Sequence, residues 1–272
     1  GRLCMSIDKS FKRAVAKIGK PELGDRVNTL MTGGDYALIR SVESFEDYEI
    51  LSRKQTDELN VTENDLLIGV TATGETTSIV GSAIRADEIG AKVYMVICSD
   101  ITKMQGKVKR VDDLYSRENV STLYLPCGAF AVAGSSRMQS STIEQLVIMS
   151  AFELVLNEDI TKEELIIKFK NIIDYLTTDA VIEMMAEYIE VESETYKKKG
   201  YVTYFTKEYT LDVLTDTTER GPTFTTPPFR PQHRTDLPLS WAFVKNPVLD
   251  NKRAWLDCLG REPRCIEWGQ EY

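Results

Sequence analysis

Histidine is nearly absent from this sequence, because His233 is the single one among 272 residues. One imidazole excludes any metal site built from several histidines, and His233 lies in a proline-rich stretch. Catalysis by histidine is therefore not expected, and any acid or base should be a carboxyl group. The sequence predicts neither a metal ion nor a redox cofactor.

Close cysteine pairs and long apolar runs are also missing. The cysteines are odd in number and far apart, which argues against a disulfide framework or a zinc motif and favours a reducing compartment: Cys4, Cys98, Cys127, Cys258 and Cys265. No stretch approaches the roughly 18 apolar residues that span a membrane. Residues 1–20 show no targeting signal. We therefore expect a cytoplasmic protein without a membrane partner.

An excess of positive charge is the third absence. Lys and Arg number 33 against 42 Asp and Glu, which gives a net charge of −9 and leaves no basic stripe for a phosphate backbone. Nucleic acid is therefore not an expected partner. The 42% hydrophobic and 28% charged residues are typical of a globular chain. Its length allows one large domain or nearly two.

Apolar runs of strand length alternate with helix-length segments in the first half of the chain. The strand candidates are residues 27–31, 66–70, 93–98 and 123–125. Such alternation is typical of βαβ units, so the sequence predicts an α/β protein with a parallel sheet.

Three successive helical patterns follow, over residues 143–156, 161–176 and 180–199. After Gly200 the pattern restarts with a strand at 201–205, a short helix at 209–214, and weaker strand signals at 241–244 and 265–268. We expect a first domain over residues 1–155, a helical connection over 156–199, and a second, smaller or partial α/β unit over 200–272.

The turn after the 66–70 strand candidate is rich in hydroxyl groups and precedes a helix. Unpaired amides and the positive end of the helix dipole attract phosphate at such a place. The candidate phosphate ligands are Thr71, Thr73, Gly74, Thr76 and Thr77. The structural alternative is that these residues only cap the helix.

A second cluster of small and hydroxyl residues, over 133–142, also precedes a helix. Ser135, Ser136 and Arg137 are its candidate anion ligands. Arg137 has a structural alternative, a salt bridge that ties the turn to the acidic surface.

These two turns carry a resemblance to a known family, together with residues 33–35, 42–47 and the initial Gly1-Arg2-Leu3. The chain resembles the sugar-isomerase (SIS) domain proteins, in the branch of bacterial N-acetylmuramic acid 6-phosphate etherase and the glucokinase regulatory protein. The resemblance covers most of residues 1–155. It implies a flavodoxin-like parallel sheet with helices on both faces that binds a sugar phosphate at the strand ends.

The resemblance also implies roles for two glutamates. Glu46 matches the carboxylate that the etherases use as a base, and Glu219 matches their acid-bearing segment, displaced into the second half of the chain. Two SIS-like halves facing each other would bring the two glutamates together. The structural alternatives are a solvated acidic helix face for Glu46 and a salt bridge to Arg220 or Arg230 for Glu219.

The chain departs from the etherase pattern at three places. Ser10 stands where the etherase acid is expected, and Gln139 stands where the pattern has Lys. The chain opens inside what resembles the loop after the family's first strand, so we expect either that this strand and its phosphate-binding turn lie upstream or that the first turn is absent.

Two main functions remain open at this point. One is a sugar-phosphate lyase of the etherase type, with Glu46 as base and Glu219 as acid. The other is a regulatory sensor that binds a sugar phosphate without turnover, and aldose–ketose isomerisation is a further alternative. The expected partners are a sugar phosphate and, through the long helical tract, further copies of the chain.

Overall fold

The computed structural model describes residues 1–39, 45–131, 136, 138–217, 233–248, 250–267 and 269. The N-terminal helix α1 (Arg2–Lys17) leads through the short 3-10 turns η1 (Pro21–Arg26), η2 (Asp35–Leu38) and η3 (Phe45–Asp47) to helix α2 (Glu49–Glu58). An alternating series follows: β1 (Leu66–Val70), α3 (Thr77–Ile89), β2 (Lys92–Ile97), η4 (Ile101–Lys103), α4 (Lys109–Tyr115) and β3 (Val120–Tyr124).

Strands β1, β2 and β3 form a parallel sheet in that spatial order. The register pairs Val70 with Val96 and Ile97 with Tyr124, so the carboxyl ends of the strands lie at one edge. The parallel α/β architecture predicted from the alternating pattern is thus confirmed. Three of the four strand candidates in the first half overlap these strands: 66–70 matches β1, 93–98 matches all but one residue of β2, and 123–125 overlaps β3 at Leu123 and Tyr124.

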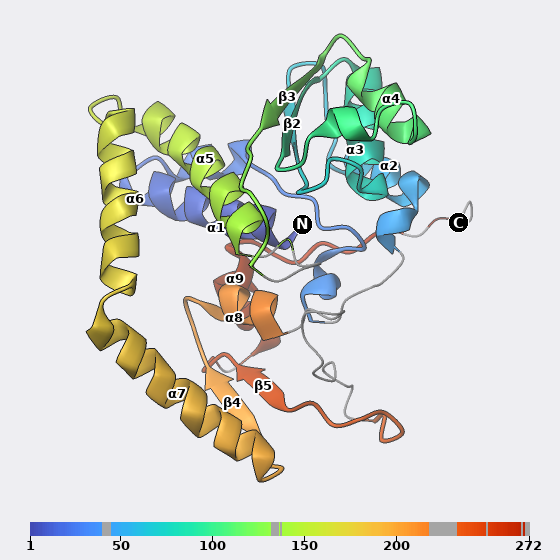
Figure 1. The fold of residues 1–272 in the computed structure, drawn as a ribbon. Helices are drawn as coiled ribbons and strands as arrows, with labels where there is room; N and C mark the ends of the chain where they lie inside the picture. Colours follow the sequence, from blue (N-terminus) through green and yellow to red (C-terminus); the bar gives the residue numbers. More distant parts are fainter. Residues whose placement is uncertain are drawn as a thin grey trace.

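Helices cover both faces of this sheet, as Figure 1 shows. On one face, Val93, Met95 and Ile97 of β2 are fully buried against α3 and α4. On the other face, Val96 packs with Ile7 of α1 and Ile148 of α5 (Gln139–Leu156). Successive side chains of a strand point to opposite faces of the sheet. Because both faces are covered here, the sequence of β2 is a nearly continuous apolar run.

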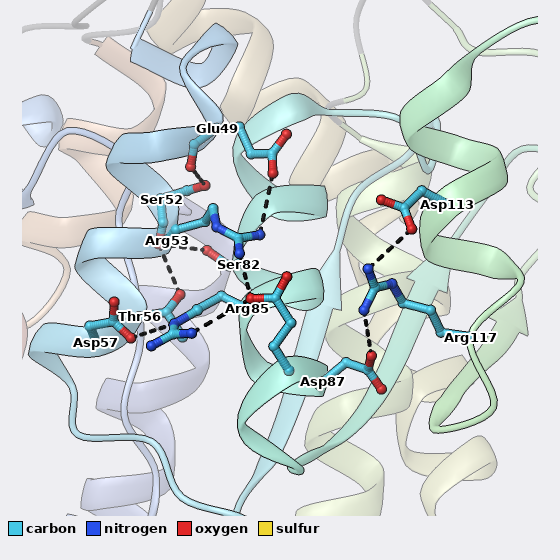
Figure 2. A network of polar contacts seen from close by, with 11 residues as sticks. Glu49, Ser52, Arg53, Thr56, Asp57, Ser82, Arg85, Asp87, Asp113 and Arg117 are labelled. Atoms are coloured by element: carbon cyan, nitrogen blue, oxygen red, sulfur yellow. Dashed lines mark hydrogen bonds and ion pairs between the residues drawn. The ribbon is translucent and has the colours of Figure 1, made fainter.

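A polar network, shown in Figure 2, joins α2, α3 and α4 on the outside of the sheet. Arg85 of α3 donates to Asp57 of α2 at 2.7 Å, and Arg53 of α2 reaches back to Glu88 of α3. Arg117 bridges Asp87 at 2.7 Å and Asp113 at 3.1 Å. These pairs are partly exposed, so they fix the helix orientations more than they add stability.

The second half begins with three long helices, α5, α6 (Lys162–Leu176) and α7 (Asp179–Lys197), which confirm the predicted helical tract. A parallel strand pair, β4 (Val202–Phe205) and β5 (Ala242–Lys245), and helices α8 (Thr210–Thr217) and α9 (Asn251–Leu259) follow. Leu211, Leu214 and Leu259 of this part share a core with Met5 and Leu38, so helices α8 and α9 pack directly on the N-terminal segment. Among the helices described, none is long and apolar enough to cross a membrane.

Two strand predictions were wrong. Residues 27–31 run extended but join no sheet, because side chains bond their carbonyl groups instead: Lys12 donates to Val27 O and Gln55 donates to Met31 O. Residues 265–267 form no strand either, and Trp268 lies outside the described residues. The Cys265–Ile266 segment packs beside Gly34, and Arg264 O accepts the amide of Asp35.

Candidate functional site

The turn between β1 and α3 lies at the carboxyl edge of the sheet. Its first residue, Thr71, is buried and extends the strand ladder by donating from its amide to Val96 O at 3.1 Å. The Thr71 and Thr76 hydroxyls lie 2.9 Å apart within hydrogen-bond distance. This contact closes the turn, and the hydroxyls of Thr73 and Thr77 are left on partly exposed residues.

Helix α4 supports the turn from behind. The Tyr115 hydroxyl donates to Gly74 O at 2.9 Å, and Arg110 Nε donates to Glu75 O at 2.7 Å. Gly74 has φ +83°, and a Cβ there would lie 2.8 Å from Ile101 Cδ1. Glycine is therefore required both by the backbone conformation and by the space available.

The backbone amides of the turn are unpaired within the described residues. From Ala72 to Ser78 no amide donates a hydrogen bond to a described group, whereas Ile79 and Val80 already donate to Thr76 O. Unpaired amides at the N-terminus of the 13-residue helix α3 are the donors that an anion needs. The local geometry therefore fits the predicted phosphate cradle.

The second predicted turn precedes α5. Ser136 is exposed, and its carbonyl accepts a weak bond from the Ser141 hydroxyl at 3.4 Å, while Ser135 and Arg137 lie outside the described residues. Gln139, at the etherase lysine position, donates to Ala129 O at 2.8 Å and accepts from the Ala131 amide at 3.0 Å. Its amide group thus fastens the loop that approaches α5.

Of the two glutamates predicted for acid and base chemistry, the structure describes Glu46 but not Glu219. Glu46 is exposed on η3, which packs against α2 and α3. Glu219 lies outside the described residues, so their convergence stays a prediction. Ser10 is partly buried in the middle of α1.

A buried carboxyl group beside the turn was not predicted. Glu144 of α5 is 4% exposed, and it accepts a bond from the Cys98 thiol at 3.5 Å. The Cys98 amide donates to Ala72 O at 3.1 Å, so Cys98 connects this carboxyl group to the 71–77 turn. Burial raises the pKa of Glu144 to about 7 and that of Cys98 to about 12. Glu144 shares one helix face with Ile148, four residues later, and that spacing was the available signal.

A cavity of about 220 Å³ lies alongside β1, on the side of this edge strand that faces away from β2. It is bounded by the 66–70 strand, by the loop around Thr29 and Thr32, and by Ser78 and Ser82 of α3. Thr32 donates to the Ser78 hydroxyl at 3.1 Å. The cavity therefore borders the start of the helix whose N-terminus forms the turn. Within the described residues, no group of three or more His, Cys, Asp or Glu side chains is arranged to hold a metal ion.

Comparison with known proteins supports the resemblance to SIS-domain proteins that the sequence showed. Residues 1–86 match the family described as the glucokinase regulatory protein N-terminal SIS domain. The N-acetylmuramic acid 6-phosphate etherase of Lactococcus lactis subsp. lactis is 29% identical over 177 residues, which are 61% of this chain and 56% of the relative. The enzymes of the same name from L. lactis subsp. cremoris MG1363 and Clostridium beijerinckii are 32% and 31% identical over 119 and 122 residues, or 44% and 45% of this chain and 36% of each relative.

These matches confirm the resemblance to SIS-domain proteins of the etherase and glucokinase-regulator branch. The chain spans just over half of the first relative's length and about a third of the other two.

Proposed function

We propose that this chain, which resembles SIS domains of the etherase and glucokinase-regulator branch, binds a sugar phosphate at the carboxyl edge of its β1–β2–β3 sheet. The observation that supports this proposal most strongly is that the amides from Ala72 to Ser78, at the N-terminus of α3, have no hydrogen-bond acceptor among the described residues. A phosphate accepts several such bonds at once, and the helix dipole favours its negative charge. Thr73 and Thr77 add hydroxyl donors, while the Thr71–Thr76 contact and Gly74 keep the turn in shape.

The second turn completes the proposed site. Ser135, Ser136 and Arg137 precede α5 in the sequence as the turn residues precede α3. Glu144, in the second turn of α5, contacts Cys98 just after β2, so α5 begins near the carboxyl edge of the sheet. We propose that Arg137 and the two serines bind the sugar or its phosphate together with the 71–77 turn.

We further propose chemistry of the etherase type, as the names of the relatives suggest. Glu46 then removes a proton from the sugar and Glu219 protonates the leaving ether oxygen. For these roles one carboxyl group must be protonated and the other ionised at the same pH. When two carboxyl groups share a cleft, their mutual repulsion and partial burial raise the pKa of one of them and so produce this difference.

A sugar-phosphate sensor is the second candidate, and two observations favour it. Glu46 is exposed, and Gln139 stands in place of the etherase lysine and is engaged with the loop. A sensor uses the same phosphate cradle but needs no acid and base.

Binding is tested first, by calorimetric titration with N-acetylmuramic acid 6-phosphate, glucose 6-phosphate and their unphosphorylated sugars. Thr73→Ala combined with Ser135→Ala should weaken phosphosugar binding by about a hundredfold, because each charge-assisted hydrogen bond contributes about tenfold. Thr203→Ala, an exposed threonine on β4, is the matched control and should leave affinity unchanged. Unaltered affinity in the double variant would place the phosphate elsewhere.

Turnover then separates the two candidates. The lyase predicts a bell-shaped pH profile, and it predicts that Glu46→Gln and Glu219→Gln each abolish turnover while binding survives. A parent that binds but converts no ether substrate would establish the sensor. Aldose–ketose conversion that persists in both Gln variants would refute the assignment of the pair.

A further inference from the structure

Two cysteines lie together where strands β2 and β3 end. Cys98 directly follows β2, and Cys127 belongs to the segment between β3 and α5. The Leu125 amide donates to Ile97 O at 2.7 Å, so the chain just before Cys127 is still held beside the end of β2. Both cysteines are free thiols. The fold thus brings two cysteines that are far apart in the sequence to one edge of the sheet.

One face of α5 contacts both thiols. The Cys127 thiol lies 3.7 Å from the Ser140 hydroxyl, and the Cys98 thiol donates to the Glu144 carboxyl group at 3.5 Å. Ser140 and Glu144 are four residues apart, so their Cβ atoms are neighbours on the helix, about 5–6 Å apart. The two thiols are also close enough to influence each other's titration. A disulfide, whose Cβ atoms lie about 4 Å apart, therefore needs only a small local movement.

The surroundings of the two thiols differ in the way that a two-step oxidation requires. Cys127 is partly exposed in a segment that forms neither helix nor strand, so an oxidant can reach it and the backbone can adjust. Cys98 is buried, and burial raises the pKa of its thiol to about 12, so this thiol needs a base. The Glu144 carboxyl group is in contact with it, and burial raises the pKa of that group to about 7. Glu144 is therefore ionised at pH 8 and is a stronger base than an ordinary carboxylate.

We propose that Cys98 and Cys127 are a reversible modification site, at which a small disulfide such as glutathione disulfide converts the two thiols into an intramolecular disulfide. The Cys127 thiolate attacks one sulfur of the oxidant, forms a mixed disulfide and releases one glutathione thiolate. Glu144 takes the proton of Cys98, whose thiolate attacks the Cys127 sulfur and expels the second glutathione thiolate. The protons of the two cysteines end on the two released glutathiones, so one glutathione disulfide is reduced while one protein disulfide forms.

The modification is connected to the turn between β1 and α3 through Cys98. The Cys98 amide donates to Ala72 O at 3.1 Å, at the start of this turn. To reach Cys127, the Cys98 side chain must leave Glu144, and Cys127 must leave Ser140. We therefore expect the disulfide to displace the turn and to weaken sugar-phosphate binding by about tenfold. The expected change in affinity rests on the proposed function, whereas the disulfide and the displacement of the turn do not.

Peptide mass spectrometry of the oxidised full chain tests the modification. After treatment with glutathione disulfide at pH 8, the expected product is a Cys98–Cys127 cross-link that dithiothreitol reverses. Cys4 of α1 also lies close enough to Glu144 to interact with it, so Cys4→Ser is the matched control and should form the same cross-link. Absence of the Cys98–Cys127 cross-link, or a cross-link that joins Cys98 to Cys4 instead, would overturn the proposal.

Glu144→Gln tests the role of the carboxyl group. Because an amide does not accept the proton, this variant should accumulate the mixed disulfide at Cys127 and form the cross-link at least about tenfold more slowly than the parent. Glu153→Gln, at an exposed glutamate further along α5, should react at the parent's rate. Equal rates for Glu144→Gln and the parent would refute this role of Glu144.

Amide NMR tests the connection to the turn without any ligand. Oxidation should shift the amide resonances of residues 72–78, and reduction should restore them. Unchanged resonances in the cross-linked protein would refute the connection. Calorimetric titration with N-acetylmuramic acid 6-phosphate and glucose 6-phosphate then compares the affinities of the reduced and oxidised protein. A reduced protein that binds neither would refute the proposed function alone, because the cross-link and the NMR shifts are measured independently of it.

Discussion

Glu144 illustrates what a single buried group contributes. Its carboxyl is shielded from water next to Cys98, and burial raises its pKa to about 7 from the ordinary 4.5. Between these two values the folded chain holds a proton that the unfolded chain has lost. The contribution of Glu144 to stability is therefore complete below about pH 4.5 and is lost as the pH rises to about 7.

Glu144→Gln should remove this dependence, because an amide cannot ionise. At pH 8 we expect the variant to be more stable than the parent, by up to about 3 kcal/mol, with little difference near pH 4.5. Urea unfolding across this range measures the effect. Glu118→Gln, at an exposed glutamate, should follow the parent's pH dependence, and a Glu144→Gln curve parallel to the parent would show that Glu144 does not titrate in this way.

Gly74 and Gly106 form a matched pair for testing how tightly the turn between β1 and α3 is packed. Both have positive φ, +83° and +72°, but a Cβ at Gly74 would meet Ile101 and Tyr115, whereas one at Gly106 meets nothing within 4 Å. Gly106→Ala should cost about 1 kcal/mol from the backbone alone, and Gly74→Ala about 2–4 kcal/mol. Equal unfolding free energies for the two variants would mean that the turn accommodates the methyl group.

Helices α2 and α3 pack closely together at Gly81. An added Cβ there would lie 2.6 Å from Glu49 Cγ and 3.0 Å from the Glu49 carbonyl oxygen. Gly81→Ala should therefore destabilise the chain by about 1–3 kcal/mol, although alanine favours a helix interior by about 1 kcal/mol. Chemical denaturation measures whether Gly81→Ala lowers or raises the free energy of unfolding. A stabilised variant would show that the two helices can separate freely.

The elements that sequence predicted well are those whose own pattern determines them. Strands β1 and β2 and helices α3, α5, α6 and α7 carry continuous or periodic apolar residues, and each was found. Residues 27–31 have the same apolar character, yet Lys12, Gln55 and Arg264 bond their carbonyl groups from distant parts of the chain. No local pattern reveals such partners.

In the candidate site too, features formed by adjacent residues could be predicted, whereas features that depend on distant parts of the chain could not. The hydroxyl-rich turn could be predicted because its residues are adjacent, and Thr71–Thr77 indeed lie at the sheet edge. Its supports, Tyr115 and Arg110, come from α4 and depend on how the helix packs. The roles of Glu46 and Glu219 rest on family resemblance, since spacing alone does not bring distant carboxyl groups together.

At the scale of the whole molecule, a buried ion network connects the two ends of the chain. Arg261 pairs with Asp35 and with Asp8 at 3.4 Å, and both carboxylates are nearly inaccessible. Arg261→Met should cost about 3–5 kcal/mol, because it leaves two buried charges without this partner. Arg234→Met removes an exposed pair with Asp236 and should cost at most about 1 kcal/mol. Equal losses of unfolding free energy would contradict this coupling.

In the proposed function, the amides of residues 72–78 bind the phosphate group of a sugar phosphate. Amide NMR of the labelled protein during titration tests it most directly, because a hydrogen bond to phosphate shifts the resonance of the donating amide. We predict that the largest shifts occur at residues 72–78, that they saturate with N-acetylmuramic acid 6-phosphate or glucose 6-phosphate, and that the unphosphorylated sugars do not produce them. Saturating shifts confined to another part of the chain, or none with any sugar phosphate, would contradict the account.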